Sequence, residues 1–264
     1  MTRIALGLEY DGSAYSGWQS QPHARSVQAE LQHALASVAT HPVQLTVAGR
    51  TDAGVHALAQ VAHFETAASR PLHAWVLGTN AAAAADVGVL WARVVPDTFH
   101  ARYSALSRSY VYRILNRSER PALERLRACW MRRPLDAARM HDAAQVLVGD
   151  HDFSAFRAAE CQSRSPHRRL LEIAVERDGD FVDIRVCANA FLHHMVRNLA
   201  GTLLLVGRGD REPGWVAAVL EGRDRTLAGP TAAPQGLYFA GVEYPPEFGL
   251  PSYKLQRPRS GAPQ

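Results

Sequence analysis

The apolar residues of this chain set out the same order of strands and helices twice, and this doubled order limits the possible folds most. In the first half the order is strand, helix, strand, strand, helix, strand. Alternating apolar residues mark the strands, and apolar residues three or four positions apart mark the helices. The strands are predicted over 4–10, 43–47, 60–64 and 87–95, and the helices begin after Ser26 and at Pro71.

The second half repeats this order with one additional helix. The dipeptide Asp178-Gly179 between two alternating runs predicts a tight β-hairpin. Gly149 and Gly207 follow the two main helical repeats, where a glycine is typical of a helix end. The strands are predicted over 108–115, 170–177, 181–188 and 237–242, and the helices over 136–148, over 191–206 and from Pro213 onwards.

A repeated β-α-β-β-α-β order predicts an α+β protein made of two tandem ferredoxin-like (RRM-like) halves with mainly antiparallel sheets. The expected parts are an N-terminal half over 1–105, a C-terminal half over 106–245 and a flexible tail over 246–264. The arginine-bearing segment 117–134 is predicted to be an irregular connection. Helices on one face of each sheet leave the other face open, either to receive RNA bases or to be covered by a partner subunit.

The composition is that of a globular protein kept in a reducing compartment. Hydrophobic residues make up 47% of the 264 residues, and no run approaches the roughly 18 apolar residues of a membrane span. The first residues lack the apolar core and cleavage site of a signal peptide. The 3 cysteines are too scattered for a disulfide framework or a paired-cysteine metal site, so we expect a cytoplasmic protein.

The basic residues are almost all arginine. The chain has 29 Lys and Arg against 25 Asp and Glu, a formal net charge of +4, and Lys254 is the only lysine. The planar guanidinium suits contact with phosphates and stacking on bases. Base composition of the genome explains an arginine preference equally well, so composition alone names no function.

The loop over 48–56 is the stretch that is richest in chemical information. Asp52 stands among small residues and two glycines, which allow a substrate backbone to come close, and Arg50 supplies a cation beside it. Taken alone, the loop is explained as well by an Asx turn at Asp52 and a solvated charge at Arg50.

Several separated motifs, in order along the chain, resemble the TruA family of tRNA pseudouridine synthases from about Ile4 to Tyr244. A single Gly-Arg-Thr-Asp motif would carry little weight, whereas an ordered set of eight motifs is specific. The motifs are Glu9-Tyr10-Asp11-Gly12, Gly17-Trp18-Gln19, Ala48-Gly49-Arg50-Thr51-Asp52-Ala53-Gly54-Val55-His56, Phe99-His100-Ala101-Arg102, Tyr110-Val111-Tyr112, Cys161-Gln162-Ser163-Arg164, Ala188-Asn189-Ala190-Phe191-Leu192-His193-His194-Met195-Val196-Arg197-Asn198 and Gly236-Leu237-Tyr238.

The resemblance implies an enzyme that isomerises uridine to pseudouridine without a cofactor or a metal, in a cleft between the two halves. Asp52 corresponds to the catalytic aspartate of the family, Tyr110 to its active-site tyrosine and Arg197 to the arginine that pairs with the aspartate. The implied substrate is the tRNA anticodon stem-loop at uridines 38, 39 and 40, and the implied assembly is a homodimer.

The reaction explains why these residue types are needed. The carboxylate of Asp52 can attack the sugar, add to the uracil ring, or remove a sugar proton, and the residues leave these routes open. A cation such as Arg197 keeps a partly buried carboxylate ionised, although a solvated charge on an amphipathic helix is the simpler interpretation of that residue. Tyr110 offers an aromatic face to a flipped uracil and a phenol that can help the C5 proton leave, although it also fits a strand residue packed in the core.

Several arginines are predicted to bind the substrate. Arg102, Arg157 and Arg164 are assigned to tRNA phosphates, together with Arg168 and Arg169. Arg50 is expected to fill the gap that a flipped base leaves. Each of them, taken singly, is also explained as a solvated charge.

Other chemistries fit the residues less well. His193 and His194 are adjacent, so on a helix they are expected to point apart and not to share a metal. A hydrolase dyad of Asp52 and His56 lacks a serine motif, and Cys161 is expected to be a small buried residue without a local partner. The remaining alternatives are a catalytically silent tRNA-binding or RNA-folding protein on the same scaffold, and a metal-dependent RNA hydrolase.

Overall fold

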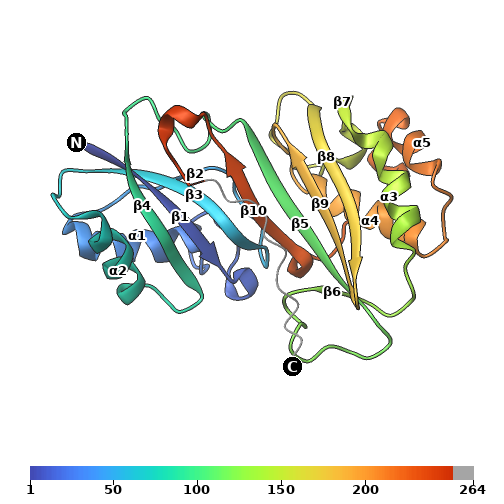
Figure 1. The fold of residues 1–264 in the computed structure, drawn as a ribbon, viewed down its shortest axis with the longest axis horizontal. Helices are drawn as coiled ribbons and strands as arrows, with labels where there is room; N and C mark the ends of the chain where they lie inside the picture. The colour runs from blue at the N-terminus through green and yellow to red at the C-terminus, as the bar shows by residue number, and fades with distance from the viewer. Residues whose placement is uncertain (252–264) are drawn as a thin grey trace.

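A computed structural model describes residues 1–251, so the segment 252–264 of the predicted tail lies outside the described residues. The described chain is a mixed α/β protein built on one open sheet of ten strands (Figure 1). The strands are β1 (Thr2–Tyr10), β2 (Thr46–Val47), β3 (His56–Thr66), β4 (Val87–Val95), β5 (Ser107–Asn116), β6 (Cys129–Met131), β7 (Gly149–Asp152), β8 (His167–Asp178), β9 (Phe181–Ala188) and β10 (Leu237–Glu243). The helices are α1 (Val27–Ala39), α2 (Leu72–Ala82), α3 (Ala137–Ala144), α4 (Met195–Gly207) and α5 (Trp215–Gly222).

The strands follow the order β4-β1-β3-β10-β5-β9-β8-β7, while β2 pairs with β3 and β6 pairs with β5. With the short strands β6 and β7 set aside, each half has four strands, and the first lies between the last and the third: β1 lies between β4 and β3, and β5 lies between β10 and β9. Helices α1 and α2 lie at one end of the sheet, and α3, α4 and α5 lie at the other (Figure 1). None of the helices in the described part is long and apolar enough to cross a bilayer.

The N-terminal half follows the sequence pattern closely. The Ser26 hydroxyl accepts the N–H of Ala29 and caps α1, as its position before the helical repeat predicts. The predicted strand over 43–47 is wrong in length, because only Thr46 and Val47 pair with β3. Val43 and Leu45 are buried in the core from an extended segment. Their alternation therefore reflects burial and not a strand ladder.

The C-terminal half departs from the pattern at several boundaries. The predicted hairpin is confirmed, and Gly179 takes the positive φ of +55° that its turn requires. The helix predicted over 136–148 ends at Ala144 and continues as a 3₁₀ turn, and the helix predicted from Phe191 begins only at Met195. The segment 117–134 contains β6, which runs parallel to β5, and the short β7 was not predicted.

A parallel pair of strands joins the two halves into one sheet. Tyr238 of β10 lies opposite His56 of β3, and Phe239 lies opposite Ala57. Parallel pairing at this point places the loop that leads into β3 beside the start of β10. The buried core runs through this join, with Phe239 fully covered and Tyr110 of β5 packed edge-to-face on it, ring centroids 5.1 Å apart. The loop that carries Asp52 therefore lies where the two halves meet.

Candidate active site

The loop that carries Asp52 is held in shape by residues of the other N-terminal motifs. The Tyr10 hydroxyl lies 2.8 Å from the Thr51 hydroxyl, and the Trp18 N–H donates to the Thr51 carbonyl oxygen at 3.0 Å. On the far side, the Gln60 amide donates to the Gly49 carbonyl oxygen at 2.8 Å. A hydrogen bond on each side of Asp52 fixes the course of the backbone, so its carboxylate is presented from a rigid loop.

Two glycines outside this loop allow the close packing. A Cβ atom at Gly12 would lie 1.9 Å from the Val55 carbonyl oxygen, which no side chain tolerates. Gly17 has a φ of +96°, and a Cβ there would lie 2.7 Å from the Thr51 carbonyl oxygen. These glycines explain why the Asp-Gly and Gly-Trp motifs accompany the aspartate loop in the sequence.

Arg197 reaches Asp52 from the first turn of α4. Its Nη1 donates to Oδ2 of Asp52 at 3.2 Å, and its Nε donates to the Ala232 carbonyl oxygen at 2.8 Å. The arginine side chain is 14% exposed and that of Asp52 is 30% exposed, so solvent screens this ion pair only in part. The structure therefore brings together the two charged residues that the sequence singled out, one from each half.

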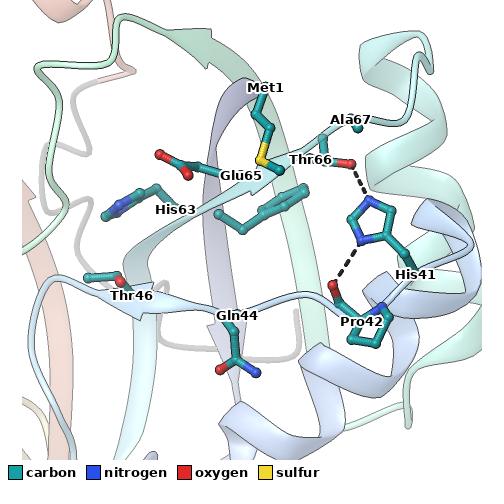
Figure 2. Close-up of a pocket in the computed structure, with 10 residues that line it drawn as sticks. Met1, His41, Pro42, Gln44, Thr46, His63, Glu65, Thr66 and Ala67 are labelled. Carbon is teal, nitrogen blue, oxygen red and sulfur yellow. Dashed lines mark hydrogen bonds between the residues drawn. The ribbon is translucent and has the colours of Figure 1, made fainter.

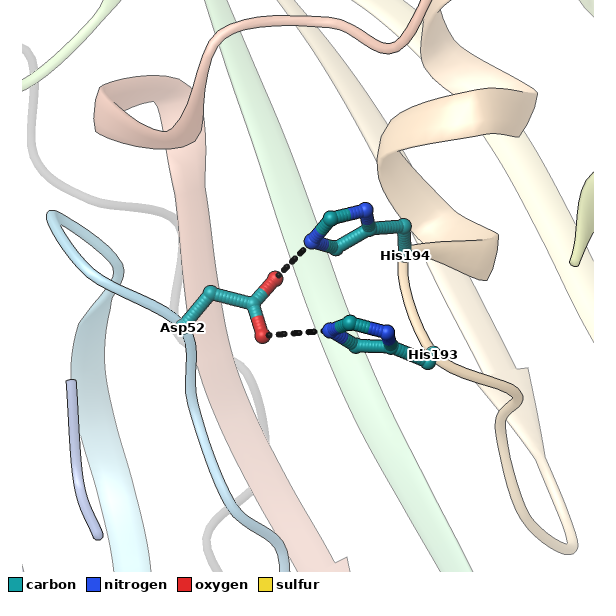
Figure 3. Close-up of side chains that lie close together, drawn as sticks. All are labelled: Asp52, His193 and His194. Atoms are coloured by element: carbon teal, nitrogen blue, oxygen red, sulfur yellow. Dashed lines mark ion pairs between the residues drawn. The ribbon is translucent and has the colours of Figure 1, made fainter. Parts of the chain in front are cut away.

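The expectation that His193 and His194 point apart is wrong. Both residues precede α4, and their rings lie side by side with centroids 4.0 Å apart. Figure 3 shows both imidazoles pointing toward Asp52. His193 Nε2 lies 3.5 Å from Oδ1, and His194 Nε2 lies 3.2 Å from Oδ2. The helical geometry that would separate adjacent side chains does not apply, because the helix begins one residue later.

An unusual backbone conformation accounts for this arrangement. His194 has φ 59° and ψ 5°, the left-handed region, and occupies the N-cap position of α4 without making a side-chain capping bond. Burial lowers the pKa of His194, and the neighbouring His193 and Arg197 lower it further against the opposing effect of Asp52. The imidazole of His194 is therefore neutral near pH 7.

Tyr110 lies on β5 at the join of the halves. Its ring packs edge-to-face against Phe191, with centroids 4.9 Å apart, and against Phe239 on the other side. Burial raises the pKa of the phenol well above its ordinary value, and the charge of Asp52 adds to this effect. The phenol therefore stays protonated near neutral pH and offers a proton rather than a negative charge.

Arg108, which sequence reasoning missed, links three of the motifs. Its side chain donates to the Ala48 carbonyl oxygen at 3.1 Å, to the Asn189 carbonyl oxygen at 3.0 Å and to the carbonyl oxygen of Arg102. The two-residue repeat of a strand could have revealed Arg108 in the sequence. Arg108 lies two positions before Tyr110 on one strand, so both side chains lie on the same face. The guanidinium holds the Asp52 loop against the segment that leads to α4.

The other predicted arginines are spread over different environments. Arg50, Arg102 and Arg164 are exposed. Arg157 instead donates to the carbonyl oxygens of Cys161 and Ser163, at 2.6 Å and 2.8 Å, and so holds a loop of its own chain. Arg168 donates to the Ser163 hydroxyl at 2.7 Å, whereas Arg169 is exposed.

His56 and Cys161 are each engaged elsewhere. His56 accepts the N–H of Gly12 at 3.1 Å, and its other ring nitrogen lies 2.9 Å from the Leu126 carbonyl oxygen. It thus fixes the segment 117–134 to the N-terminal half. Cys161 is buried, as expected, and its sulfur accepts the backbone N–H of the distant His193 at 3.4 Å. The cysteine thereby helps to place His193.

Asp52, His193 and His194 together offer one carboxylate and two imidazoles, with donor atoms all within 4.8 Å of one another. This donor set is typical of zinc and similar ions. The guanidinium of Arg197 already neutralises Oδ2, however, and a second cation at the same oxygen would be repelled. The cluster therefore fits the stabilisation of a carboxylate better than the binding of a metal ion.

A separate hollow of about 540 Å³ lies beside β2 and β3, and Figure 2 shows the residues around it. His41 bridges part of its rim, with ring nitrogens 2.8 Å from the Pro42 carbonyl oxygen and 2.8 Å from the Thr66 hydroxyl. None of the residues around this hollow belongs to the cluster at Asp52.

A family model described as tRNA pseudouridine synthase matches residues 8–104 and 143–245, which include Asp52, Arg197 and both histidines. The chain belongs to this family. The tRNA pseudouridine synthase A of Nitrosococcus oceani is 54% identical over 97% of this chain and 98% of that protein. The proteins of the same name from Methylococcus capsulatus and Burkholderia thailandensis are 55% and 53% identical, over 94% and 96% of this chain and 92% and 94% of those proteins. The similarity to this family therefore extends over both halves of the sheet.

Proposed function

We propose that this protein isomerises uridine to pseudouridine in tRNA, at positions 38, 39 and 40 of the anticodon stem-loop. The observation that carries the proposal is the ion pair of Asp52 with Arg197, on a rigid loop, in a chain similar over nearly its whole length to proteins named tRNA pseudouridine synthase A. Asp52 acts as the nucleophile or base, Arg197 keeps it ionised, and Tyr110 contacts the flipped uracil.

The isomerisation suits a site of this kind. The N1–C1′ bond of uridine breaks and the uracil turns. C5 then bonds to C1′, its hydrogen leaves as a proton, and N1 takes up a proton. No electrons are gained or lost overall, so a carboxylate and proton-transferring groups are sufficient. Attack on the sugar, addition to the ring and removal of a sugar proton all begin from an ionised carboxylate, which the cation of Arg197 stabilises.

The fold and the surface support binding of an RNA stem-loop. We propose two ferredoxin-like halves, over 1–105 and 106–245, because each half has its first strand between its last and third strands. The exposed guanidinium groups of Arg50, Arg102 and Arg164 are available for phosphates or for the gap in the stack. Arg157 contributes by shaping the loop beside the site. We further propose that the protein acts as a homodimer in the cytoplasm.

Replacement of Asp52 tests the proposed function. Purified full-length protein is incubated with tRNA tritiated at C5 of uridine, without added metal, and release of tritium is measured. We expect release by the wild-type protein and none by Asp52→Ala or by the nearly isosteric Asp52→Asn. Binding of tRNA is expected to survive in both variants, because phosphate contacts supply most of the affinity.

Two other outcomes identify the alternatives. A wild-type protein that binds the anticodon stem-loop but releases no tritium is a silent RNA-binding protein, and the proposal fails. A wild-type protein that shortens the RNA, and loses this activity in the presence of a chelator, is a metal-dependent hydrolase. Mass spectrometry of the RNA identifies the hydrolase, because only hydrolysis shortens the RNA, whereas tritium release separates the isomerase from the silent binder.

A further inference from the structure

We propose that His194 is a positioning residue that, with Arg197, occupies Oδ2 of Asp52 and leaves Oδ1 as the oxygen that reacts with the substrate. This inference rests on the proposed function, because it concerns how the carboxylate is presented for the isomerisation. The proposal gives the two oxygens of the Asp52 carboxylate different roles.

The contacts of the carboxylate are unequal. Arg197 Nη1 and His194 Nε2 each lie 3.2 Å from Oδ2, whereas within residues 1–251 the one charged or imidazole group beside Oδ1 is His193 Nε2, at 3.5 Å. Each carboxylate oxygen accepts about two polar contacts in its plane. Oδ2 therefore has two groups beside it, of which Arg197 donates a hydrogen bond, and Oδ1 is the more open oxygen for a reacting atom. The exposed fractions of the two histidines agree with this difference, since the His193 side chain beside Oδ1 is 38% exposed and the His194 side chain beside Oδ2 is 26% exposed.

The backbone at His194 indicates that its side chain is placed for a purpose other than folding. A residue other than glycine in the left-handed region is disfavoured, and it persists only where the surroundings impose it. At the N-cap of a helix, a side chain would ordinarily satisfy a backbone N–H, but His194 makes no such bond. The conformation instead turns its imidazole toward Asp52, as Figure 3 shows.

The charges around His194 define what it supplies. Asp52, His193 and Arg197 face it within the cluster, and Glu160 adds a more distant negative charge. The pKa of His194 is lowered, so the ring is neutral near pH 7 and offers a polar contact, while Arg197 supplies the positive charge. Loss of the His194 contact should therefore make the ionised carboxylate less stable and less well aligned. Binding of tRNA should change little.

The experiment compares three replacements of His194 in the full-length protein, by steady-state tritium release across pH 5–9. We expect His194→Ala to lower kcat about 10- to 100-fold, the usual effect of losing a polar contact to a charged group. The KM for tRNA should stay within about twofold. His194→Gln, whose side-chain amide can donate to the carboxylate, should recover most of the rate.

His194→Gly separates a catalytic role from a structural one. Glycine adopts a φ near 60° without strain, so this variant should melt at or above the wild-type temperature. Its kcat should nevertheless be as low as that of His194→Ala. His193→Ala is the matched control, since it removes the neighbouring imidazole that faces Oδ1, and its kcat should fall less than that of His194→Ala.

The inference is overturned if His194→Ala keeps the wild-type kcat, if His194→Gln is as impaired as His194→Ala, or if His193→Ala loses as much activity as His194→Ala. A lower melting temperature for His194→Gly, in parallel with its loss of activity, also overturns it by assigning a structural role. A wild-type protein without tritium release refutes the proposed function itself, so the two failures are distinguishable.

Discussion

Arg197 donates from Nη1 to Oδ2 of Asp52 at 3.2 Å, across 145 residues of sequence. The same guanidinium is fixed by its Nε, which donates to the Ala232 carbonyl oxygen, and the N–H of Ala232 donates back to the Arg197 carbonyl oxygen at 3.1 Å. The arginine is thus anchored in the C-terminal half before it meets the aspartate. The ion pair depends on the two halves keeping their relative position.

The guanidinium of Arg197 supplies both a positive charge and a planar double contact, so replacements that remove one or both should lower the activity by different amounts. Arg197→Lys keeps a positive charge, but an ammonium cannot bond Ala232 and Asp52 together in one plane, so we expect kcat to fall about 10- to 100-fold. Arg197→Met removes the charge and should cost about 1,000-fold, comparable to the loss of a strong electrostatic contact in an enzyme site. Tritium release under saturating tRNA measures both effects.

Binding of tRNA provides the control for these variants. Filter binding at a fixed salt concentration should give dissociation constants within a few-fold of the wild-type value, because Arg197 is mostly buried and faces Asp52. If Arg197→Lys and Arg197→Met lose activity equally, the retained charge of lysine contributes nothing, and loss of the planar double contact accounts for the whole effect.

Tyr110 allows its ring and its hydroxyl to be tested separately. Tyr110→Phe keeps the edge-to-face contacts with Phe191 and Phe239, so the free energy of unfolding should change by less than about 1 kcal/mol. We expect its kcat to fall about 10- to 100-fold through loss of the proton-transferring hydroxyl. Because burial raises the pKa of the phenol, the alkaline limb of the kcat profile below pH 9 should be the same in both proteins.

Tyr110→Ala should instead lose about 3–5 kcal/mol of stability by leaving a cavity between the two phenylalanines. Urea unfolding separates this effect from a loss of chemistry. Wild-type kcat in Tyr110→Phe would limit the residue to stacking and packing, and would exclude a role for the hydroxyl.

The sequence predicted most elements of the fold because their causes are local. The Ser26 cap, the Asp178-Gly179 turn and the alternation along β1 and β9 each act within a few residues. The misses arose where pairing between distant segments decided the outcome. Val43 and Leu45 alternate without a neighbouring strand. β6 is a strand because it pairs with the end of β5 that extends past β10, and β7 because it pairs with the free edge of β8.

The cluster at Asp52 was only partly predictable for the same reason. Asp52, Arg197 and Tyr110 were found through ordered motifs, not through their spacing. His193 and His194 were set aside because a helix was assumed to include them, whereas one left-handed residue at His194 reverses that conclusion. Single-residue backbone conformations of this kind depend on tertiary contacts, which a pattern of apolar residues does not reveal.

The buried His63 should make the stability of the folded protein depend on pH, independently of catalysis. Its Nδ1 accepts the N–H of Ala101 at 3.1 Å, in a buried position. Burial, together with the charges of His100 and Arg3, lowers the pKa of His63 from 6.5 to about 4. Between these two values the unfolded chain binds a proton that the folded protein does not, so stability is complete above pH 6.5 and falls as the pH decreases toward 4.

The measurement is urea unfolding of wild-type protein and His63→Asn at pH 7.5 and pH 5. Asparagine keeps an acceptor oxygen near the position of Nδ1 but does not titrate. The wild-type protein should lose about 2 kcal/mol more than the variant between these two pH values, as the shift from 6.5 to about 4 requires. An equal loss in both proteins would mean that His63 is protonated as easily in the folded protein as in the unfolded chain. In that case the hydrogen bond from Ala101, which a protonated ring cannot accept, contributes little to stability.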